Sequence, residues 1–249
     1  MRYFLSLAYR GTRYAGWQRQ PNALSVQEVL ENSLSMLLRQ PIEVVGCGRT
    51  DAGVHARYYV AHFDAEGELP KTFLQNINGI LPGDIAVYTV KRMPSEAHAR
   101  YDAVERHYCY YISLRKDPFA QETAWLYPHA GLLDINLLQR MANLLMQYEA
   151  FLPFCKTDSN VEHYRCRLHM ARWEYLLDEN QLVFQIAANR FLRGMVRLIV
   201  GTCLAVARGV LTLEGVREAL EKQQPLPKSI SVPAHGLALT NVRYPYPIS

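Results

Sequence analysis

The sequence has 249 residues, of which 49% are hydrophobic, so it can bury one large core or two joined smaller cores and is too long for a mini-domain held by disulfides. The formal net charge of +4 is too small to predict nucleic-acid binding by itself. The five cysteines are an odd number without any Cys-x-x-Cys pair, which argues against a disulfide framework or a zinc knuckle and favours a reducing compartment.

Strand and helix signals alternate over residues 1–105. A capping box, Ser25-x-x-Glu28, begins a helix, because these two side chains pair with backbone N–H groups that the first helical turn leaves without partners. Pro41 ends that helix. Runs rich in β-branched and aromatic residues predict strands at Tyr3 to Tyr9, Ile42 to Val45, Tyr58 to Phe63 and Ile85 to Val90. We expect residues 1–105 to form one mixed α and β subdomain.

Residues 106–249 repeat this outline with a different sequence. Asp134 caps a predicted helix that continues through Leu145. Further strands are predicted at Arg106 to Leu114, Leu168 to Leu176, Leu182 to Ala187 and Leu237 to Arg243, and further helices at Phe191 to Arg208 and Leu213 to Lys222. The stretch from Gln224 to Pro233 is the best candidate for a mobile loop. We therefore predict an α+β fold with a second subdomain over residues 106–249.

The sequence predicts neither export nor membrane insertion. The longest mainly apolar run, Leu198 to Ala207, is about half of the roughly 20 residues that a membrane helix needs, and Arg197 and Arg208 bound it. The first strand continues into Tyr9-Arg10-Gly11-Thr12-Arg13, which is neither an apolar signal core nor a cleavage site. We expect a cytoplasmic protein that does not associate with membranes.

The segment from Gly46 to Ala56 combines glycines with a single carboxylate, Asp51. Glycines let the backbone turn tightly and bring polar side chains to a surface. The simplest interpretation is a turn in which Asp51 accepts hydrogen bonds from nearby backbone N–H groups. On spacing alone, this interpretation is favoured over a functional one. The segment lacks the Lys-Ser/Thr of a phosphate-binding P-loop, and no glycines at dinucleotide-binding spacing open a helix.

Nine consecutive residues of this segment, Gly48-Arg49-Thr50-Asp51-Ala52-Gly53-Val54-His55-Ala56, resemble the nucleophile motif of the TruA-type tRNA pseudouridine synthases. Shorter segments are similar to other signatures of that family: Tyr9-Arg10-Gly11-Thr12, Gly16-Trp17-Gln18, Gln20-Pro21-Asn22, Ser25-Val26-Gln27, His98-Ala99-Arg100-Tyr101, Tyr108 with Tyr110, Phe191-Leu192 with Met195-Val196-Arg197, and Gly236-Leu237-Ala238-Leu239. The resemblance therefore covers nearly the whole chain. Two features depart from the family pattern, namely Arg10, where many relatives have an acid, and the segment 154–160.

The resemblance implies an isomerase that converts uridine to pseudouridine in the anticodon stem-loop of tRNA, at positions 38–40. The uracil is detached from its ribose, turned and rejoined through carbon instead of nitrogen, which requires neither a metal nor a cofactor. The implied fold is the pseudouridine synthase fold, in which two ferredoxin-like subdomains with mixed or antiparallel sheets join around a central cleft. The implied partners are tRNA and a second copy of the chain, because the family forms homodimers in which each tRNA touches both subunits.

By this resemblance, Asp51 is the candidate nucleophile, since a carboxylate that attacks the sugar or the base ring divides one difficult step into easier ones. To stay ionised in a poorly hydrated pocket, it needs a guanidinium within about 4 to 6 Å. Arg197 is the expected partner, by resemblance and because helical periodicity places it on a basic face of the predicted helix. That face contains Arg190, Arg193, Arg197, Arg208, Gly194 and Gly201. Without the resemblance, a solvated basic side of a buried helix explains the face somewhat better.

Two further residues are expected to bind substrate. Arg49 is a second cation, suited to bind phosphate or to hold the backbone open. The resemblance implies that Tyr108 packs against the target uracil, and stacking on an extruded base contributes about 1 to 3 kcal/mol. An ordinary core position is the common alternative for a strand tyrosine, and Tyr110 replaces Tyr108 if the strand register differs. His55 has no identifiable acid partner and is expected to be structural.

Two other functions are compatible with parts of the sequence. A non-catalytic tRNA-binding or folding protein would keep the RNA contacts, but the intact motif around Asp51 argues against it. A glycosidase or nucleosidase usually needs two acids that flank one bond, and the motif supplies only Asp51.

Overall fold

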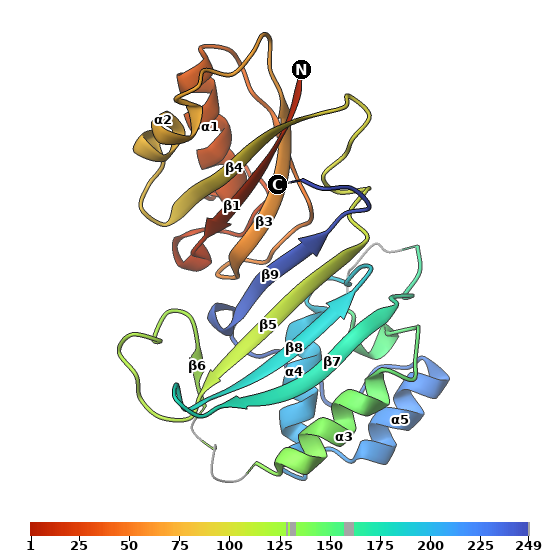
Figure 1. Cartoon of the computed structure of the whole chain (residues 1–249). Coiled ribbons are helices and arrows are strands. Elements are labelled where there is room, and N and C mark those ends of the chain that lie inside the picture. Colours follow the sequence, from red (N-terminus) through yellow and green to blue (C-terminus); the bar gives the residue numbers. More distant parts are fainter. Residues whose placement is uncertain (128, 130–132, 157–161, 249) are drawn as a thin grey trace. The chain divides into compact units, whose positions relative to one another are not determined.

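The structure is a computed structural model that describes residues 1–127, 129, 133–156 and 162–248. The chain is an α+β protein that divides into two compact units. Unit 1 comprises Met1–Arg106 and Ala238–Ser249, and unit 2 comprises His107–Leu237 (Figure 1). The first break lies next to the predicted boundary at residue 105, whereas residues from Ala238 onward group with unit 1 instead of the second subdomain. Within the described ranges, no helix combines the length and the hydrophobicity that crossing a bilayer demands.

Unit 1 contains a ferredoxin-like βαββαβ arrangement. Its elements are β1 (Arg2–Tyr9), the 3-10 helix η1 (Gly11–Arg13), α1 (Val26–Leu38), β2 (Val44–Gly46), β3 (His55–Asp64), α2 (Phe73–Ile80) and β4 (Ile85–Met93). Antiparallel pairing orders these strands β4-β1-β3-β2. The last strand of the chain, β9 (Leu237–Arg243), pairs with β3 in parallel, with His55 opposite Ala238. This pairing explains why residues from Ala238 onward belong to unit 1.

The sequence predicts one of the two helices of unit 1, α1, and does not predict the other, α2. The prediction for α1 is confirmed, since the Ser25 side chain accepts a hydrogen bond from the Glu28 N–H at 3.2 Å. The helix ends at Leu38, because Arg39 takes the left-handed conformation with φ 54°. Our sequence signals do not predict α2, which is short and whose N-cap residue, Thr72, makes no capping hydrogen bond through its side chain.

The sheet of unit 1 is covered on both faces. Phe63 of β3 stacks on Phe73 of α2 with 6.3 Å between ring centroids, on the face where α1 and α2 lie (Figure 1). On the opposite face, Phe4 of β1 makes edge contacts with Tyr244 at 5.9 Å and with Tyr246 at 6.4 Å. The residues after β9 therefore complete the core that β1 begins, since alternate side chains of a strand point to opposite faces.

His62 makes the stability of unit 1 depend on pH. It is buried, and burial, followed by the positive charge of Arg2, lowers its pKa from 6.5 to about 4. Because the unfolded chain takes up this proton more readily, we expect the contribution of His62 to the free energy of unfolding to level off above pH 6.5 and to fall by about 2 to 3 kcal/mol between pH 6.5 and pH 4. Urea unfolding at both ends of this range should show a smaller fall in His62→Gln, and an equal fall in both proteins would contradict the assignment.

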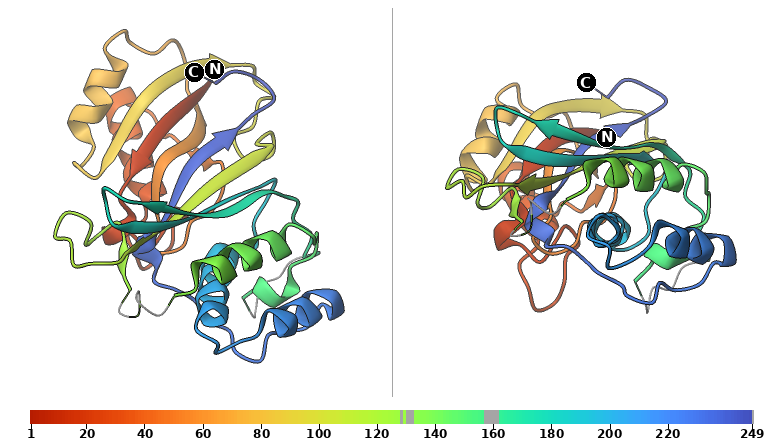
Figure 2. Two further views of the ribbon diagram at one scale, coloured as in Figure 1. Left: turned by 60° about the horizontal axis from the view of Figure 1, so that its bottom comes forward. Right: turned by 90° about the horizontal axis from the view of Figure 1, so that it is seen from below.

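The described residues of unit 2 form a three-stranded sheet, a short additional strand, three α-helices and two 3-10 helices. Its elements are β5 (Glu105–Ser113), which starts at the end of unit 1, β6 (Trp125–Leu126), α3 (Ile135–Leu145), the 3-10 helix η3 (Leu152–Phe154), β7 (Leu168–Leu176), β8 (Gln181–Ala188), α4 (Met195–Ala207), α5 (Leu213–Lys222) and the 3-10 helix η4 (Ala234–Gly236). The strand order is β5-β8-β7, and β6 pairs with β5. Figure 2 shows α3 and α4 on one side of the β7–β8 hairpin.

In unit 2, single residues define the start of α3, which was predicted, and the hairpin of β7 and β8. Asp134 caps α3, since its carboxylate accepts a hydrogen bond from the Leu137 N–H at 3.0 Å. The hairpin turns through Asn180, which has a positive φ of 48°. Across the hairpin, Trp173 lies opposite Phe184, and their rings lie 4.9 Å apart. Cross-strand aromatic pairs of this kind stabilise a hairpin.

The predicted start of α4 at Phe191 is wrong. Gly194 is the N-cap, and its left-handed conformation with φ 70° is incompatible with a helix that passes through it. Consequently Arg190 and Arg193 precede the helix and Arg208 follows it, so they do not form a helical face with Arg197. Every other residue of α4 is buried, which leaves Arg197 as its one half-exposed position.

Candidate active site

Residues 47–54, which we call the Asp51 loop, connect β2 to β3 in unit 1. The side chain of Asp51 is half-buried, and its backbone carbonyl accepts a hydrogen bond from the Val54 N–H at 3.1 Å. The segment after β1 supports the loop, because the Trp17 N–H donates to the Thr50 carbonyl at 3.2 Å and the Gly53 N–H donates to the Tyr14 carbonyl at 3.3 Å. The backbone around Asp51 is thus fixed by main-chain hydrogen bonds.

Three buried aromatic side chains support the loop on both sides of Arg49. Trp17 stacks on Tyr59 with 4.1 Å between ring centroids, and Tyr9 lies 5.5 Å from Tyr59. The Tyr59 hydroxyl donates to the Gly48 carbonyl, and the hydroxyl groups of Tyr9 and Thr50 are hydrogen-bonded at 2.9 Å. Arg49 itself is exposed.

His55, directly after the loop, is buried and holds the neighbouring turn. Its Nδ1 accepts a hydrogen bond from the Gly11 N–H at 3.0 Å. This nitrogen therefore carries no proton in that arrangement. The geometry agrees with the structural role that we predicted for His55.

Gly11 leaves no room for a side chain beside the Asp51 loop. A Cβ at this position would lie 2.0 Å from the Val54 carbonyl oxygen. We expect Gly11→Ala to lower the free energy of unfolding by about 3 kcal/mol, because a backbone atom has to move. Gly83→Ala is the matched control, since its Cβ would meet no atom within 4 Å, and should change stability by less than about 0.5 kcal/mol. Equal midpoints of urea unfolding for the two variants would refute this close contact.

Arg106 is a supporting residue that the sequence did not reveal. Its guanidinium donates to the carbonyl oxygens of Cys47 at 2.9 Å, Arg100 at 2.8 Å and Ala103 at 2.7 Å. It therefore joins the start of the Asp51 loop to residues 100–103. Its acceptors are backbone atoms, which have no signature in the amino-acid sequence.

In unit 2, Tyr108 and Tyr110 of β5 have different environments. Tyr108 is half-buried, and its ring meets Phe191 edge-on, at 5.2 Å and 89°. Tyr110 is fully buried, and its hydroxyl donates to the Pro233 carbonyl at 2.8 Å. Burial raises the pKa of Tyr110, an effect that the charge of Arg197 opposes. Tyr108 thus presents a partly open ring, whereas the alternative, Tyr110, is a core residue.

Arg197 is held by the segment that precedes η4. Its Nε donates to the Val232 carbonyl at 2.8 Å, and its own carbonyl accepts from the Val232 N–H at 3.3 Å. Nearby, a Cβ on Gly201 would lie 2.0 Å from the Ile230 carbonyl oxygen, so α4 and this segment are in close contact. Residues 224–233 form no helix or strand, as expected of a loop, but their last part is anchored on α4.

The structure distributes the predicted site residues over both units. Asp51 and Arg49 share one loop in unit 1, and Tyr108 and Arg197 belong to unit 2. Residues 157–160 of the atypical segment lie outside the described residues. Within the described ranges, no group of three or more His, Cys, Asp or Glu side chains could hold a metal ion.

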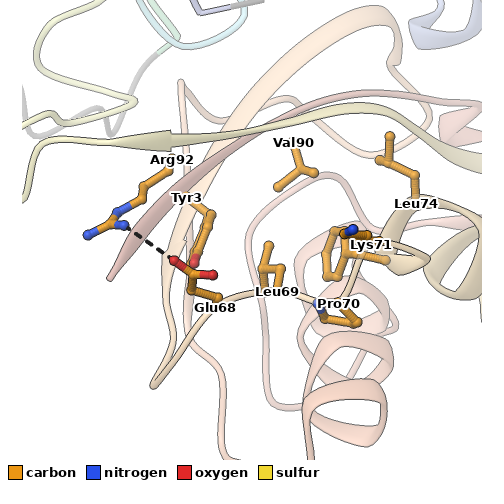
Figure 3. A pocket seen from close by; sticks show the side chains of 9 residues that line it. Tyr3, Glu68, Leu69, Pro70, Lys71, Leu74, Val90 and Arg92 are labelled. Atoms are coloured by element: carbon orange, nitrogen blue, oxygen red, sulfur yellow. Dashed lines mark ion pairs between the residues drawn. The ribbon is translucent and has the colours of Figure 1, made fainter.

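A hollow elsewhere in unit 1 contains none of the predicted site residues. It lies between the start of α2 and β4 (Figure 3). At its rim, Arg92 and Glu68 form an ion pair at 3.9 Å in which both side chains are exposed. Exposed pairs of this kind add little to stability or binding, and we assign no role to the hollow.

Comparison with known proteins identifies the family. A family model described as tRNA pseudouridine synthase matches residues 6–102 and 148–245. The chain belongs to the tRNA pseudouridine synthase family. It is therefore an isomerase with the pseudouridine synthase fold, as the sequence resemblance predicted. The matched ranges include Arg49, Asp51 and Arg197, whereas Tyr108 lies between them.

Curated relatives match over almost their entire length. The chain is similar to tRNA pseudouridine synthase A of Bacteroides thetaiotaomicron, with 46% identity over 246 residues, which cover 98% of this chain and 91% of that protein. It is 45% identical to tRNA pseudouridine synthase A of Porphyromonas gingivalis over 247 residues, 98% of this chain and 97% of that protein. The protein of the same name from Exiguobacterium sibiricum is 34% identical over 245 residues, 98% of this chain and 97% of that protein.

Proposed function

We propose that the protein converts uridine to pseudouridine in the anticodon stem-loop of tRNA, at positions 38–40, with Asp51 as the nucleophile. The observation that carries this proposal is the match to the tRNA pseudouridine synthase family over a range that includes the intact Asp51 motif. The relatives named tRNA pseudouridine synthase A support tRNA as the substrate. The protein acts as a homodimer, and each tRNA touches both subunits.

The proposed reaction breaks the bond between N1 of uracil and C1′ of the ribose and forms a bond between C5 and C1′. The C5 proton leaves, and N1 ends with a proton, so the product has the same atoms as the substrate. Asp51 forms the covalent intermediate, through either the sugar or the base ring, and the adduct is released when the new carbon–carbon bond is complete. The reaction needs no oxidant and no reductant.

Three other residues have proposed roles in this reaction. Arg197 supplies the positive charge that keeps the carboxylate of Asp51 ionised. Tyr108 packs its partly open ring against the target uracil, which offsets much of the few kcal/mol needed to unstack that base. Arg49, exposed on the Asp51 loop, binds phosphate.

Release of tritium from tRNA that carries C5-labelled uridine tests this function directly, because the C5 proton leaves only when the new bond forms. We expect the wild-type protein to release tritium from anticodon-arm uridines without any added cofactor. Mapping the modified positions tests the assignment to positions 38–40, and sedimentation tests the homodimer. The absence of tritium release by folded wild-type protein would overturn the proposed function.

We expect the affinity for tRNA to depend strongly on salt. Each phosphate that an arginine or lysine neutralises releases counterions, so the logarithm of the association constant falls with the logarithm of salt concentration by about 0.7 per phosphate on single strands and about 0.9 on duplex. Binding isotherms over a range of salt concentrations measure this slope. An affinity that does not change with salt would contradict a phosphate-binding role for Arg49.

A further inference from the structure

Residues 97–102, which we call the Tyr101 loop, present one large side chain to solvent from a rigid backbone. The side chain of Tyr101 is 76% exposed, and within the described part of the chain its hydroxyl makes no hydrogen bond. Such a side chain contributes little to the stability of the fold, because its apolar surface is not removed from water. A single exposed aromatic residue is ordinary, so the case for a function depends on its surroundings.

The backbone of the Tyr101 loop is held by its own side chains. The His98 Nδ1 accepts hydrogen bonds from the N–H groups of Arg100 at 3.1 Å and Tyr101 at 3.2 Å. The Asp102 carboxylate accepts from the His98 N–H at 2.8 Å, and the Asp102 N–H donates back to the His98 carbonyl at 3.1 Å. These bonds close the loop on itself and fix the backbone that carries Tyr101.

The rest of unit 1 also holds the loop. The Ala99 N–H donates to Nδ1 of the buried His62 at 3.1 Å, and the Ala99 carbonyl accepts from the Tyr244 hydroxyl at 2.5 Å. The Tyr246 hydroxyl donates to the Asp102 carboxylate at 2.6 Å. A loop with so many partners does not need to become ordered when it binds a ligand, so little of the binding free energy is lost.

The ring of Tyr101 has a second ring and a cation as neighbours. The His98 ring backs it at 4.2 Å between centroids and 31° between planes, and the Arg100 guanidinium lies 5.8 Å from its centroid. Burial, followed by the charge of Arg2, lowers the pKa of His98 and so favours its neutral form. An exposed aromatic ring beside an arginine is the combination with which proteins bind unpaired nucleotides, since every base has a π-face and every nucleotide a phosphate.

Arg106 connects this loop to the Asp51 loop. One guanidinium nitrogen donates to the Arg100 carbonyl at 2.8 Å and to the Cys47 carbonyl at 2.9 Å. The two loops are therefore joined by hydrogen bonds within unit 1. A nucleotide bound by the Tyr101 loop is held at a fixed position relative to the Asp51 loop.

We propose that Tyr101, together with Arg100, is a stacking site for an unpaired base of the RNA substrate that neighbours the uridine being modified. This inference rests on the proposed function for its substrate, but it concerns binding and not the chemical step. Tyr101 stacks on the base, His98 supports the ring from the other side, and Arg100 pairs with the adjoining phosphate.

Binding of a synthetic anticodon stem-loop RNA to the full-length protein with Asp51→Asn tests the site without turnover. We expect Tyr101→Ala to raise the Kd about tenfold, as expected for the loss of one base–aromatic stack, and Tyr101→Phe to change it by less than about twofold. Tyr88→Ala is the matched control, because Tyr88 is also an exposed tyrosine of unit 1, 55% exposed on β4, and should leave the Kd unchanged. A Kd for Tyr101→Ala within twofold of the parent protein would overturn the proposal.

Three further measurements separate stacking from charge and from self-association. Arg100→Ala should reduce the salt slope by about 0.7, whereas Tyr101→Ala should leave the slope unchanged. An RNA with 2-aminopurine beside the target position should lose fluorescence on binding, but not with Tyr101→Ala. If Tyr101→Ala instead alters the sedimentation of the protein without altering the Kd, the ring belongs to a protein interface and the proposal is wrong. If folded wild-type protein released no tritium, the proposed reaction would be wrong. The Kd of Tyr101→Ala would still decide the stacking proposal, because it measures binding without turnover.

Discussion

Replacement of Asp51 by Asn is expected to lower the rate of pseudouridine formation by at least about 10³-fold, because an uncharged amide cannot serve as the nucleophile. The side chain keeps its size, and the loop is held through backbone groups of Thr50, Gly53 and Val54, so the fold should be retained. Tritium release under single-turnover conditions measures the rate, and thermal unfolding checks the fold. We expect the affinity of this variant for tRNA to stay within about threefold of wild type.

Asp64→Asn is the matched control for the expected loss of activity in Asp51→Asn. Asp64 ends β3 in the same unit, and it forms an ion pair with Arg2 at 2.8 Å on the protein surface. Loss of this pair should change stability by no more than about 1 kcal/mol and leave turnover unchanged. Tritium release by Asp51→Asn within tenfold of the wild-type rate would mean that another group is the nucleophile, or that the non-catalytic tRNA-binding alternative applies.

Replacement of Arg197 by Ala is expected to slow turnover by about 10²- to 10³-fold with a KM for tRNA within about threefold of wild type. The reason is that its proposed role is to favour the charged nucleophile and not to hold the RNA. Arg197→Lys should restore only part of the rate, because lysine keeps a positive charge but lacks the planar fork with which Arg197 binds the Val232 carbonyl. Steady-state kinetics of both variants separate kcat from KM.

Arg193→Ala is the comparison for this effect. Arg193 is exposed and precedes α4, so its loss should raise KM for all tRNA substrates alike and leave kcat nearly unchanged. If Arg193→Ala lowered kcat and Arg197→Ala raised only KM, the roles of the two arginines would be reversed.

Local signals predicted most of the elements, because they act between residues that are close in sequence. Capping by Ser25 and Asp134 is an interaction over three residues, and α5 and β9 have the predicted ends. The error at α4 has the same origin, since the apolar pattern from Phe191 onward is helical in period but Gly194 takes a left-handed conformation. Periodicity alone cannot show a positive φ at a glycine.

Features that depend on distant parts of the chain could not be predicted. Nothing local indicates that β9 pairs with β3, and the hydrogen bonds of Arg106 and Arg197 go to backbone carbonyls, whose positions depend on the fold. The same limit applies to the tyrosines of β5: strand alternation places Tyr108 and Tyr110 on one face, but only packing decides which of them is partly open. The sequence motif makes Asp51 the candidate nucleophile, and the fold shows which groups hold its loop.

The pairing of β9 with β3 has a consequence for synthesis on the ribosome. Residues 107–237 are translated between the main part of unit 1 and the strand that completes its sheet. Until that strand emerges, a nascent chain carries an open edge at the start of β3, beyond the part that β2 covers, and an uncovered Phe4, both of which favour association with other chains. A premature stop codon before residue 238 should therefore produce an insoluble fragment, even though the Asp51 motif is already present in it.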